Sequence, residues 1–187
     1  MKRLSEERIF PIINGKVFSF FLIIDLFYAT KIGAFLEYSS YSIFKSQVRQ
    51  NLETIMKILF LCTGNSYRSP LAEALLKQLR PDLEVDSAGL QVAIPIGRET
   101  RRYLKKANGL QFLKSFPESL YEKNLRNYDL IVAMEPRHKN AVLRKCPECE
   151  KRIVVWNIED PYLMEPKAVE RVFNNIEDKV KNIAKTL

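Results

Sequence analysis

The stretch ILFLCTGNSYRSP, residues 58 to 70, decides the fold of this chain. Its first half is a short apolar segment rich in strand formers, and it predicts a buried parallel strand over 57–61. From Ser69 onward the signal is helical. Serine is a favoured N-cap, Pro70 suits the first helical position, and apolar residues then recur at helical spacing. The sequence therefore predicts a strand, a loop and a helix over 69–80.

The loop of this unit combines a thiol with the features of an anion-binding site. Gly64 and Asn65 tolerate the left-handed backbone that turns successive N–H groups inward, and such a nest at a helix N-terminus binds anions. Arg68 adds a cation that can grip two oxygens. The same field favours the nucleophilic thiolate form of Cys62. A lone cysteine at a strand end is more often a small core residue. The whole combination nevertheless indicates phosphoryl transfer through a cysteinyl-phosphate intermediate.

Strands and helices alternate after this loop. Further strands are predicted over 83–87, 129–134 and 152–156, and further helices over 98–107, 136–144 and 166–186. Such alternation predicts the α/β class, here a three-layer α/β/α sandwich with a central four-stranded parallel sheet and the phosphate-binding loop after the first strand. Ligands of such sheets bind beyond the carboxyl ends of the strands, where Cys62 is expected.

Four segments carry a resemblance to a known family. They are LFLCTGNSYRSPLAEALL (59–76), VDSAGL (85–90), YDLIVAME (128–135) and VVWNIEDPY (154–162). Together they resemble the low-molecular-weight protein tyrosine phosphatase family, which shares its fold with the thioredoxin-coupled arsenate reductases. The resemblance covers residues 56–187, which we expect to form one phosphatase domain, and leaves 1–55 as an N-terminal extension.

The resemblance implies a role for each polar residue of the loop. Cys62 would be the nucleophile and Arg68 the phosphate clamp. Ser69 would steady the thiolate by a hydrogen bond, and Asn65 would brace the loop. Asp160 would be the general acid that protonates the leaving oxygen. The phosphate would be held by Thr63, Gly64, Asn65, Ser66, Tyr67 and Arg68. The resemblance implies neither a metal nor a cofactor.

Two tyrosines gain an interpretation from the same resemblance. Tyr162 would line the wall of the cleft, where an aromatic substrate ring would stack. Tyr67 occupies the position at which many members of the family have a second cysteine, which can protect the nucleophile by a disulfide within the loop. Without that partner, Cys62 is expected to be more exposed to irreversible oxidation.

Five other polar or reactive residues are expected to have no catalytic role. Asp129 and Glu135 flank the third predicted strand and are expected to be structural, and His138 is expected on an exposed helix face. Cys146 and Cys149 form a C-P-E-C pair, which lacks the further thiol and imidazole ligands of a four-ligand zinc site. We expect this pair in a surface loop, oxidisable but without a part in catalysis.

Length and charge fit an enzyme domain with an anionic substrate. The chain has 187 residues, which suffice for one domain with a substantial core. Its net charge is +8. Residues 56–187 contain 23 basic and 17 acidic residues and therefore carry +6 of this charge. The surplus suits a phosphorylated protein or a small phosphomonoester. No dense basic block interleaved with aromatics predicts nucleic-acid binding, and no pattern indicates an oligomeric state. A catalytic thiol needs a reducing compartment, so we expect a cytoplasmic location.

Residues 1–55 admit three interpretations. The favoured one is an over-long start, with Met56 as the true first residue. The others are an extra helix packed on the domain and a membrane segment over 17–36. Asp25 and Lys31 oppose a membrane span because each costs about 2.5–3.5 kcal/mol near the bilayer centre. A signal peptide would lack a clean cleavage site. Membrane association of this segment is therefore open but not favoured.

The function most consistent with these motifs is that of a protein tyrosine phosphatase. A phosphoarginine phosphatase is an alternative, because a small hydroxyl residue at the position of Ser66 is associated with that preference among bacterial relatives. A thioredoxin-coupled arsenate reductase needs two further cysteines, beginning near Glu135, with a spacing and place that Cys146 and Cys149 do not have. A non-catalytic phosphate-binding module is disfavoured because nucleophile, clamp and acid are all present.

Overall fold

The computed structural model describes residues 12–13, 16–17 and 55–187, and the chain divides into two units, Met1–Thr54 and Ile55–Leu187. In the first unit, β1 (Ile12–Ile13) and β2 (Lys16–Val17) pair in antiparallel orientation. The expected membrane segment over 17–36 lies outside the described residues except for Val17, and the extra helix that the sequence left open within 1–55 is not among the described residues.

The second unit is built on a parallel sheet with four strands. Its members are β3 (Lys57–Cys62), β4 (Glu84–Gly89), β5 (Leu130–Ala133) and β6 (Ile153–Val155). They are arranged in the order β4-β3-β5-β6, and all neighbouring pairs are parallel. The register places Cys62 opposite Gly89 and places Leu61 opposite Ala133. The carboxyl ends of these strands therefore meet at one edge, with the end of β3 between its neighbours.

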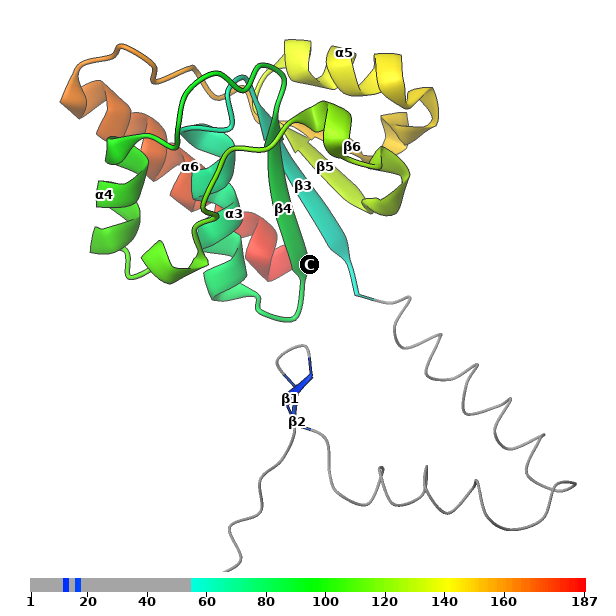
Figure 1. The fold of residues 1–187 in the computed structure, drawn as a ribbon, viewed down its shortest axis with the longest axis horizontal. Coiled ribbons are helices and arrows are strands. Elements are labelled where there is room, and N and C mark those ends of the chain that lie inside the picture. Colours follow the sequence, from blue (N-terminus) through cyan, green and yellow to red (C-terminus); the bar gives the residue numbers. More distant parts are fainter. Residues whose placement is uncertain (1–11, 14–15, 18–54) are drawn as a thin grey trace, which may run out of the picture. The chain divides into compact units, whose positions relative to one another are not determined.

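Helices cover both faces of this sheet (Figure 1). On one face lie α3 (Arg68–Leu79), α4 (Arg98–Lys106) and α6 (Pro166–Thr186), and on the other lies α5 (Pro136–Lys145). Short 3-10 turns complete the connections, namely η1 (Leu110–Phe112), η2 (Leu120–Glu122), η3 (Leu125–Asn127) and η4 (Pro147–Arg152). The expected three-layer α/β/α sandwich with a four-stranded parallel sheet is confirmed.

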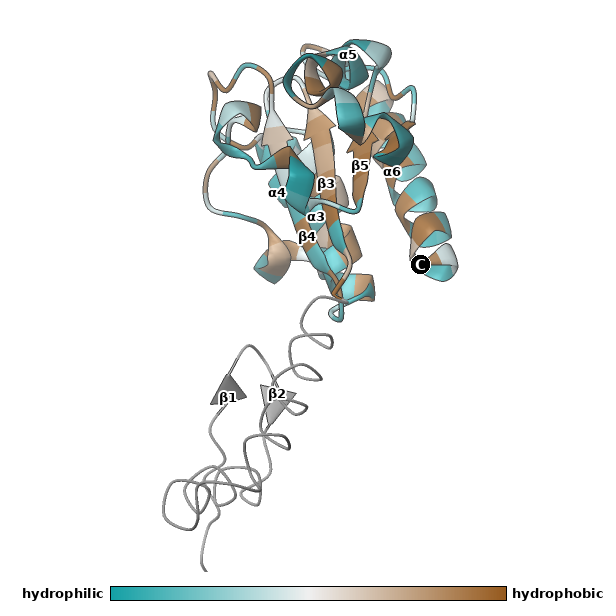
Figure 2. Ribbon diagram, turned by 90° about the vertical axis from the view of Figure 1, so that its right-hand side faces the viewer, coloured by the Kyte–Doolittle hydropathy of each residue, from teal (hydrophilic) through white to brown (hydrophobic). Residues whose placement is uncertain are grey.

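The central strand β3 separates two apolar cores. Ile58 and Phe60 are fully buried on the face covered by α3 and α6, whereas Leu59 and Leu61 are fully buried on the face covered by α5. Burial on both faces is what gives parallel strands their continuous apolar sequence. Figure 2 shows the same division, with hydrophobic strands inside and helices that are hydrophilic on their outer sides. In the part of the chain that the structure describes, no helix is both long and apolar enough to cross a membrane.

One local prediction about the first helix is wrong. The helix α3 begins at Arg68 with Tyr67 at the N-cap position, so Ser69 lies inside the first turn instead of capping it. The hydroxyl of Ser69 instead faces the thiol of Cys62, at an Oγ–Sγ distance of 3.0 Å. A buried polar partner has thus taken the hydroxyl that a cap would use. All other predicted strands and helices are present, with ends within two residues of those expected.

Candidate active site

The loop between β3 and α3 closes into a cradle. Asn65 has a φ of 52°, which is the left-handed conformation that the sequence predicted for an anion-binding nest. Gly89, at the end of β4, lies directly against this loop. A Cβ atom there would sit 2.7 Å from the backbone nitrogen of Asn65 and 2.8 Å from the carbonyl carbon of Gly64. Because those neighbours are backbone atoms of the cradle itself, only glycine fits at position 89.

The thiol of Cys62 lies at the floor of the cradle, where two polar groups face it. Its side chain is almost fully buried, and its Sγ atom is 3.3 Å from the backbone nitrogen of Asn65 and 3.0 Å from the Oγ atom of Ser69. Ser69 Oγ accepts a hydrogen bond from the side-chain amide of Asn65 at 2.8 Å, so its own proton points either to the sulfur or to the carbonyl of Ala88. Both groups can therefore stabilise negative charge on the sulfur.

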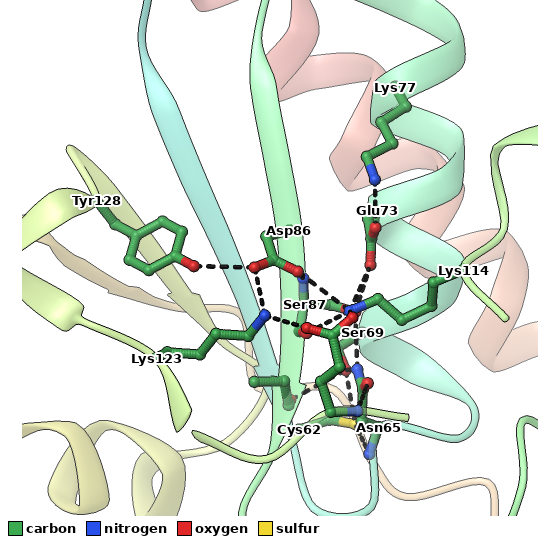
Figure 3. A network of polar contacts seen from close by, with 12 residues as sticks. Cys62, Asn65, Ser69, Glu73, Lys77, Asp86, Ser87, Lys114, Lys123 and Tyr128 are labelled. Carbon is green, nitrogen blue, oxygen red and sulfur yellow. Dashed lines mark hydrogen bonds and ion pairs between the residues drawn. The ribbon is translucent and has the colours of Figure 1, made fainter. Parts of the chain in front are cut away.

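A chain of hydrogen bonds runs from this thiol into the core (Figure 3). The Asn65 amide donates both to Ser69 and to Ser87, the latter at 2.7 Å, and Ser87 in turn donates to Glu73 at 2.6 Å. The amide oxygen of Asn65 accepts from the backbone N–H of Glu118 at 2.8 Å. The Asn65 side chain is thus held at both ends, which fixes the strained turn of the loop.

Three lysines neutralise the carboxylates at the far end of this chain, and the nearest to Glu73 is Lys77, at 2.5 Å. The Nζ atom of Lys114 is 2.9 Å from Glu118, 3.1 Å from Asp86 and 3.4 Å from Glu73, and Lys123 reaches Asp86 at 2.6 Å. Burial alone would raise the pKa of Asp86, but the hydrogen bond from Lys123 and the charge of Lys114 hold it at about 2. The brace of the loop therefore ends in paired charges and leaves no isolated buried ion.

Arg68 reaches into the cleft from the first turn of α3, and its side chain is only 1% exposed. Its Nη1 atom donates to Glu135 Oε1 at 2.5 Å and to the carbonyl of Ile158 at 2.9 Å. Its Nη2 atom donates to Thr63 Oγ1 at 3.0 Å and to Asp160 Oδ2 at 2.5 Å. These acceptors fix the plane of the guanidinium, so little further ordering is needed for it to grip two oxygens of an anion.

Asp160 reaches the mouth of the cleft from the loop that follows β6. Its side chain is 34% exposed, and its Oδ2 atom lies 3.8 Å from Arg137 in addition to its contact with Arg68. Its Oδ1 atom accepts from the backbone N–H of Tyr162 at 3.3 Å. Asp160, Arg68 and Cys62 line the same cleft. A carboxyl group at this mouth can exchange a proton with an oxygen of a bound molecule.

His138 is fully buried, so the expectation of an exposed helix face is wrong. Its Nδ1 atom accepts from the backbone N–H of Glu135 at 3.0 Å, and its Nε2 atom lies 3.2 Å from Thr63 Oγ1. The first contact requires an unprotonated Nδ1, so the ring proton is on Nε2 and is donated to Thr63. Burial, and next the charge of Arg68, lower the pKa of His138 to about 4. The neutral ring supports the cradle from the first turn of α5.

Glu135 does more than the structural role that the sequence suggested. Its carboxylate accepts from Arg68 and, at 2.9 Å, from the Nε atom of Arg137. Burial would raise the pKa of Glu135, but the hydrogen bonds from these two arginines lower it below its usual value. Glu135 is therefore an anion that orients both guanidinium groups. Asp129, in contrast, is structural as expected, since it accepts from the backbone N–H of Lys57 at 2.8 Å.

Tyr67 and Tyr162 form an aromatic wall on one side of the cleft. Their ring centroids are 6.3 Å apart in an edge-to-face arrangement, and Tyr162 is 52% exposed. Burial, and next the charge of Glu99, raise the pKa of Tyr67, so this residue remains a neutral phenol. Ile94 lies on the lining of the same cleft. The wall offers an apolar surface of the kind on which another aromatic ring can pack.

Ser66 lines the cleft, but its hydroxyl is committed to the protein backbone. The Oγ atom donates to the carbonyl of Ile94 at 3.0 Å and lies 3.2 Å from the carbonyl of Gly64. The backbone carbonyl of Ser66 accepts from Gly97 N–H at 2.9 Å and from the hydroxyl of Thr100 at 3.1 Å. Ser66 therefore ties the cradle to the start of α4.

Cys146 and Cys149 form a disulfide bond, and both are buried. The expectation of a surface loop is wrong, because η4 packs the pair into the α5-side core together with Leu120 and Leu125. Cys62 is consequently the only free thiol among the three cysteines of the chain. Within the described residues, no three His, Cys, Asp or Glu side chains are grouped so that they could hold a metal ion.

Comparison with known proteins adds a family to this geometry. A family model described as "Low molecular weight phosphotyrosine protein phosphatase" matches residues 57–187. Among similar proteins, the low molecular weight protein-tyrosine-phosphatase Wzb of Salmonella typhi is 34% identical over 139 residues, which are 70% of this chain and 93% of that protein. Residues 57–187, which the family model matches, contain every residue that lines the cleft.

Solved structures give the same result. Vibrio vulnificus Wzb in complex with benzylphosphonate superposes with a TM-score of 0.65 at 27% identity, covering 71% of this chain and 99% of that one. Wzb from Escherichia coli K30 in complex with sulphate superposes with a TM-score of 0.64 at 30% identity, again covering 71% and 99%. The likeness therefore extends over nearly the whole of each of those proteins.

Proposed function

The chain belongs to the low molecular weight phosphotyrosine protein phosphatase family, and from that premise we propose that it hydrolyses phosphotyrosine in proteins through a cysteinyl-phosphate intermediate. The observation that carries the proposal is the convergence of Cys62, Arg68 and Asp160 on one cleft. In this proposal Cys62 is the nucleophile, Arg68 the clamp and Asp160 the proton donor.

The first half of the reaction transfers the phosphoryl group to sulfur. The Cys62 thiolate attacks phosphorus in line with the leaving oxygen, an S–P bond forms, and the bond between phosphorus and the tyrosyl oxygen breaks. Asp160 gives its proton to that oxygen, so tyrosine leaves as a neutral phenol. The backbone N–H groups of residues 63–67 and the Arg68 guanidinium stabilise the charge on the three equatorial oxygens.

The second half releases phosphate. The Asp160 carboxylate takes a proton from a water molecule, the water oxygen bonds to phosphorus, and the S–P bond breaks. The electrons of that bond return to Cys62 as a thiolate. Ser69 and the N–H of Asn65, at 3.0 Å and 3.3 Å from the sulfur, stabilise this leaving thiolate. The enzyme is regenerated with Asp160 protonated for another cycle.

The aromatic wall supports tyrosine as the phosphorylated residue. A phosphotyrosine whose phosphate lies in the cradle would place its ring beside Tyr67 and Tyr162. An aromatic pair of this kind is worth about 0.5–1.5 kcal/mol beyond the area it buries. Phosphoarginine remains the second candidate because Ser66 lines the cleft. Its hydroxyl proton points to the Ile94 carbonyl, which leaves the oxygen able to accept a hydrogen bond from a guanidinium. The aromatic wall is therefore the feature that favours phosphotyrosine over phosphoarginine.

The positions of the other cysteines oppose an arsenate reductase. A reductase would need additional thiols next to Cys62 in the cleft, near Glu135. Cys146 and Cys149 instead lie beyond the far end of α5 and are bonded to each other in the core. Phosphoryl transfer, which needs only the groups that line the cleft, is therefore the reaction we propose.

The test compares two substrates and one variant. Wild-type protein should hydrolyse a phosphotyrosine peptide with a higher kcat/KM than the same peptide carrying phosphoarginine. Cys62→Ser should abolish turnover of both and still bind inorganic phosphate, because serine keeps the cradle but forms no anion at neutral pH. Substantial residual turnover by the pure variant would refute the nucleophile. Faster turnover of the phosphoarginine peptide would make phosphoarginine, and not phosphotyrosine, the substrate.

Location and domain organisation follow from the same chemistry. A nucleophilic thiol must stay reduced, which supports a cytoplasmic location. The Cys146–Cys149 disulfide counts against that location, because disulfides are rare in the cytoplasm. We assign the phosphatase activity to residues 56–187, since the cradle, the proton donor and both cores lie there. The partners would be phosphorylated proteins.

A further inference from the structure

A single face of α4 carries four exposed cations. Arg98, Arg101, Arg102 and Lys105 follow the spacing i, i+3, i+4 and i+7, which places them on one side of the helix. We call this set the α4 stripe. The opposite side of the helix is buried through Thr100 and Leu104. The stripe is about 10 Å long, because a helix rises about 1.5 Å per residue.

The cations of the α4 stripe differ from three of the cations on α5. On α5, Arg137 pairs with Glu135 at 2.9 Å, Lys139 lies 3.8 Å from Glu150, and Lys145 donates to three backbone carbonyls. Within residues 55–187, no side chain of the α4 stripe has a salt bridge or a hydrogen bond to a neighbouring group. Charged helix faces are often simply solvated, but an unpaired run of one sign creates a local positive potential.

The α4 stripe begins at the aromatic wall of the cleft. Gly97, the residue before Arg98, touches the ring of Tyr67 so closely that a Cβ atom there would lie 2.7 Å from it. Its N–H also bonds to the carbonyl of Ser66 in the cradle, at 2.9 Å. The first cation of the stripe is therefore next to the residue that supports Tyr67. A peptide that leaves the cleft over this wall meets the stripe.

We propose that the α4 stripe binds an acidic segment that flanks the phosphorylated residue of substrate proteins. This inference rests on the proposed function. The positive charge of the stripe favours an acidic segment. Its place next to the cleft favours a segment close to the phosphorylated residue. An extended chain covers about 3.3–3.6 Å per residue, so about three acidic residues span the stripe. Such contacts at the rim act chiefly on association rate and specificity.

The test uses the full chain and two phosphotyrosine peptides. One peptide carries three glutamates on each side of the phosphotyrosine, and the other carries glutamines at the same positions. The readout is the ratio of kcat/KM for the acidic peptide to that for the neutral one. We expect a ratio of about ten for the wild type at low ionic strength, falling toward one as salt is added. In Arg101→Glu/Arg102→Glu the ratio should fall to one or below.

A matched control separates a local effect from net charge. Arg144→Glu/Lys151→Glu makes the same charge change at two exposed cations beyond the cleft, at the end of α5 and in η4. It should keep most of the wild-type ratio. An equal loss in both double variants, or a ratio of one in the wild type, would overturn the inference. If the wild type failed to hydrolyse even the neutral peptide, the proposed function would fail instead.

A further double variant guards against misfolding. Arg101→Gln/Arg102→Gln removes two positive charges without adding negative ones and should lower the ratio by an intermediate amount.

Binding of anionic lipid vesicles through the α4 stripe, together with equal turnover of both peptides, would assign the stripe to a membrane and would also overturn the inference.

Discussion

The Nη2 atom of Arg68 lies 2.5 Å from the Oδ2 atom of Asp160, so the proposed phosphate clamp is paired with the proposed proton donor. A phosphoryl group that takes this N–H competes with the carboxylate for it. A dianionic phosphate is a strong acceptor of such charge-assisted bonds. We therefore expect substrate binding to free Asp160 to turn toward the leaving oxygen, which would couple binding to positioning of the acid.

Asp160→Asn should slow the enzyme according to the leaving group. Phenyl phosphate, whose leaving oxygen needs a proton, should lose about 10²–10⁴-fold in kcat/KM, which reports the transfer of the phosphoryl group to sulfur and not the later hydrolysis common to all esters. An activated ester such as 2,4-dinitrophenyl phosphate should lose much less, because its anion departs without help. Steady-state kinetics on a series of aryl phosphates measures this dependence. The affinity for inorganic phosphate shows that the cradle is intact, and an equal loss for every ester would make Asp160 a loop brace.

Arg68→Lys should remove most of the activity. An ammonium group cannot reproduce the planar contact with two oxygens, so we expect kcat/KM to fall by about 10²-fold or more. Arg137→Lys is the matched control, because it makes the same chemical change at an arginine that is 56% exposed and contacts the same Glu135. Circular dichroism should show that both variants are folded. Similar kinetics in the two variants would mean that Arg68 is not the clamp.

His138 should make the protein sensitive to mild acid. The pKa of His138 is about 4 in the folded state and about 6.5 in an unfolded chain, so between these values unfolding takes up a proton. The stabilisation from the neutral ring is complete above pH 6.5. It should be lost at about 1.4 kcal/mol per pH unit as the pH falls toward 4.

His138→Gln tests this directly, because glutamine can both accept from Glu135 N–H and donate to Thr63 but does not titrate. Urea unfolding at pH 7, 6 and 5 should give a shallower loss of unfolding free energy for the variant than for the wild type. Asp86, whose pKa is about 2, titrates below this window and does not obscure it. Parallel pH dependences would show that His138 is not the group responsible.

A chain that begins at Met56 should fold and keep its kcat/KM. The strand β3, the cradle, Asp160 and α6 all follow this residue, and Ile55–Leu187 form a unit separate from Met1–Thr54. Circular dichroism and phosphatase kinetics on the shortened chain provide the measurement. Aggregation or loss of activity would show that residues 1–55 contribute to the domain, and the over-long start would then be rejected.

The fold was predictable because its signals are local. Apolar runs marked β3 and β5, helical spacing marked α6, and their alternation implied a covered parallel sheet. The N-cap predicted at Ser69 is wrong because its hydroxyl turns back to Cys62 and Asn65, seven and four residues earlier in the buried cradle. Capping rules consider the backbone N–H groups that follow a residue and not the side chains that precede it.

The same division applies to the site. The cradle is one continuous segment, so its motif placed Cys62 and Arg68 together. The supports come from other elements: Gly89 ends β4, and Glu135 and His138 follow β5. Their roles depend on the order β4-β3-β5-β6, which puts both neighbours beside β3. The M-E-P-R-H segment at a strand end was the one available signal, because parallel sheets bind ligands there.

Glycine is required at position 97 by the contact with a neighbouring side chain and not by the backbone angles. Its φ of −58° and ψ of 145° suit any residue, but a Cβ atom would meet the Tyr67 ring at 2.7 Å. A methyl group added there would force the Tyr67 ring to shift, and this ring lines the cleft but is not the nucleophile, the clamp or the proton donor. The width of the cleft beside Tyr67 and the rate of the chemical step can therefore change independently of one another.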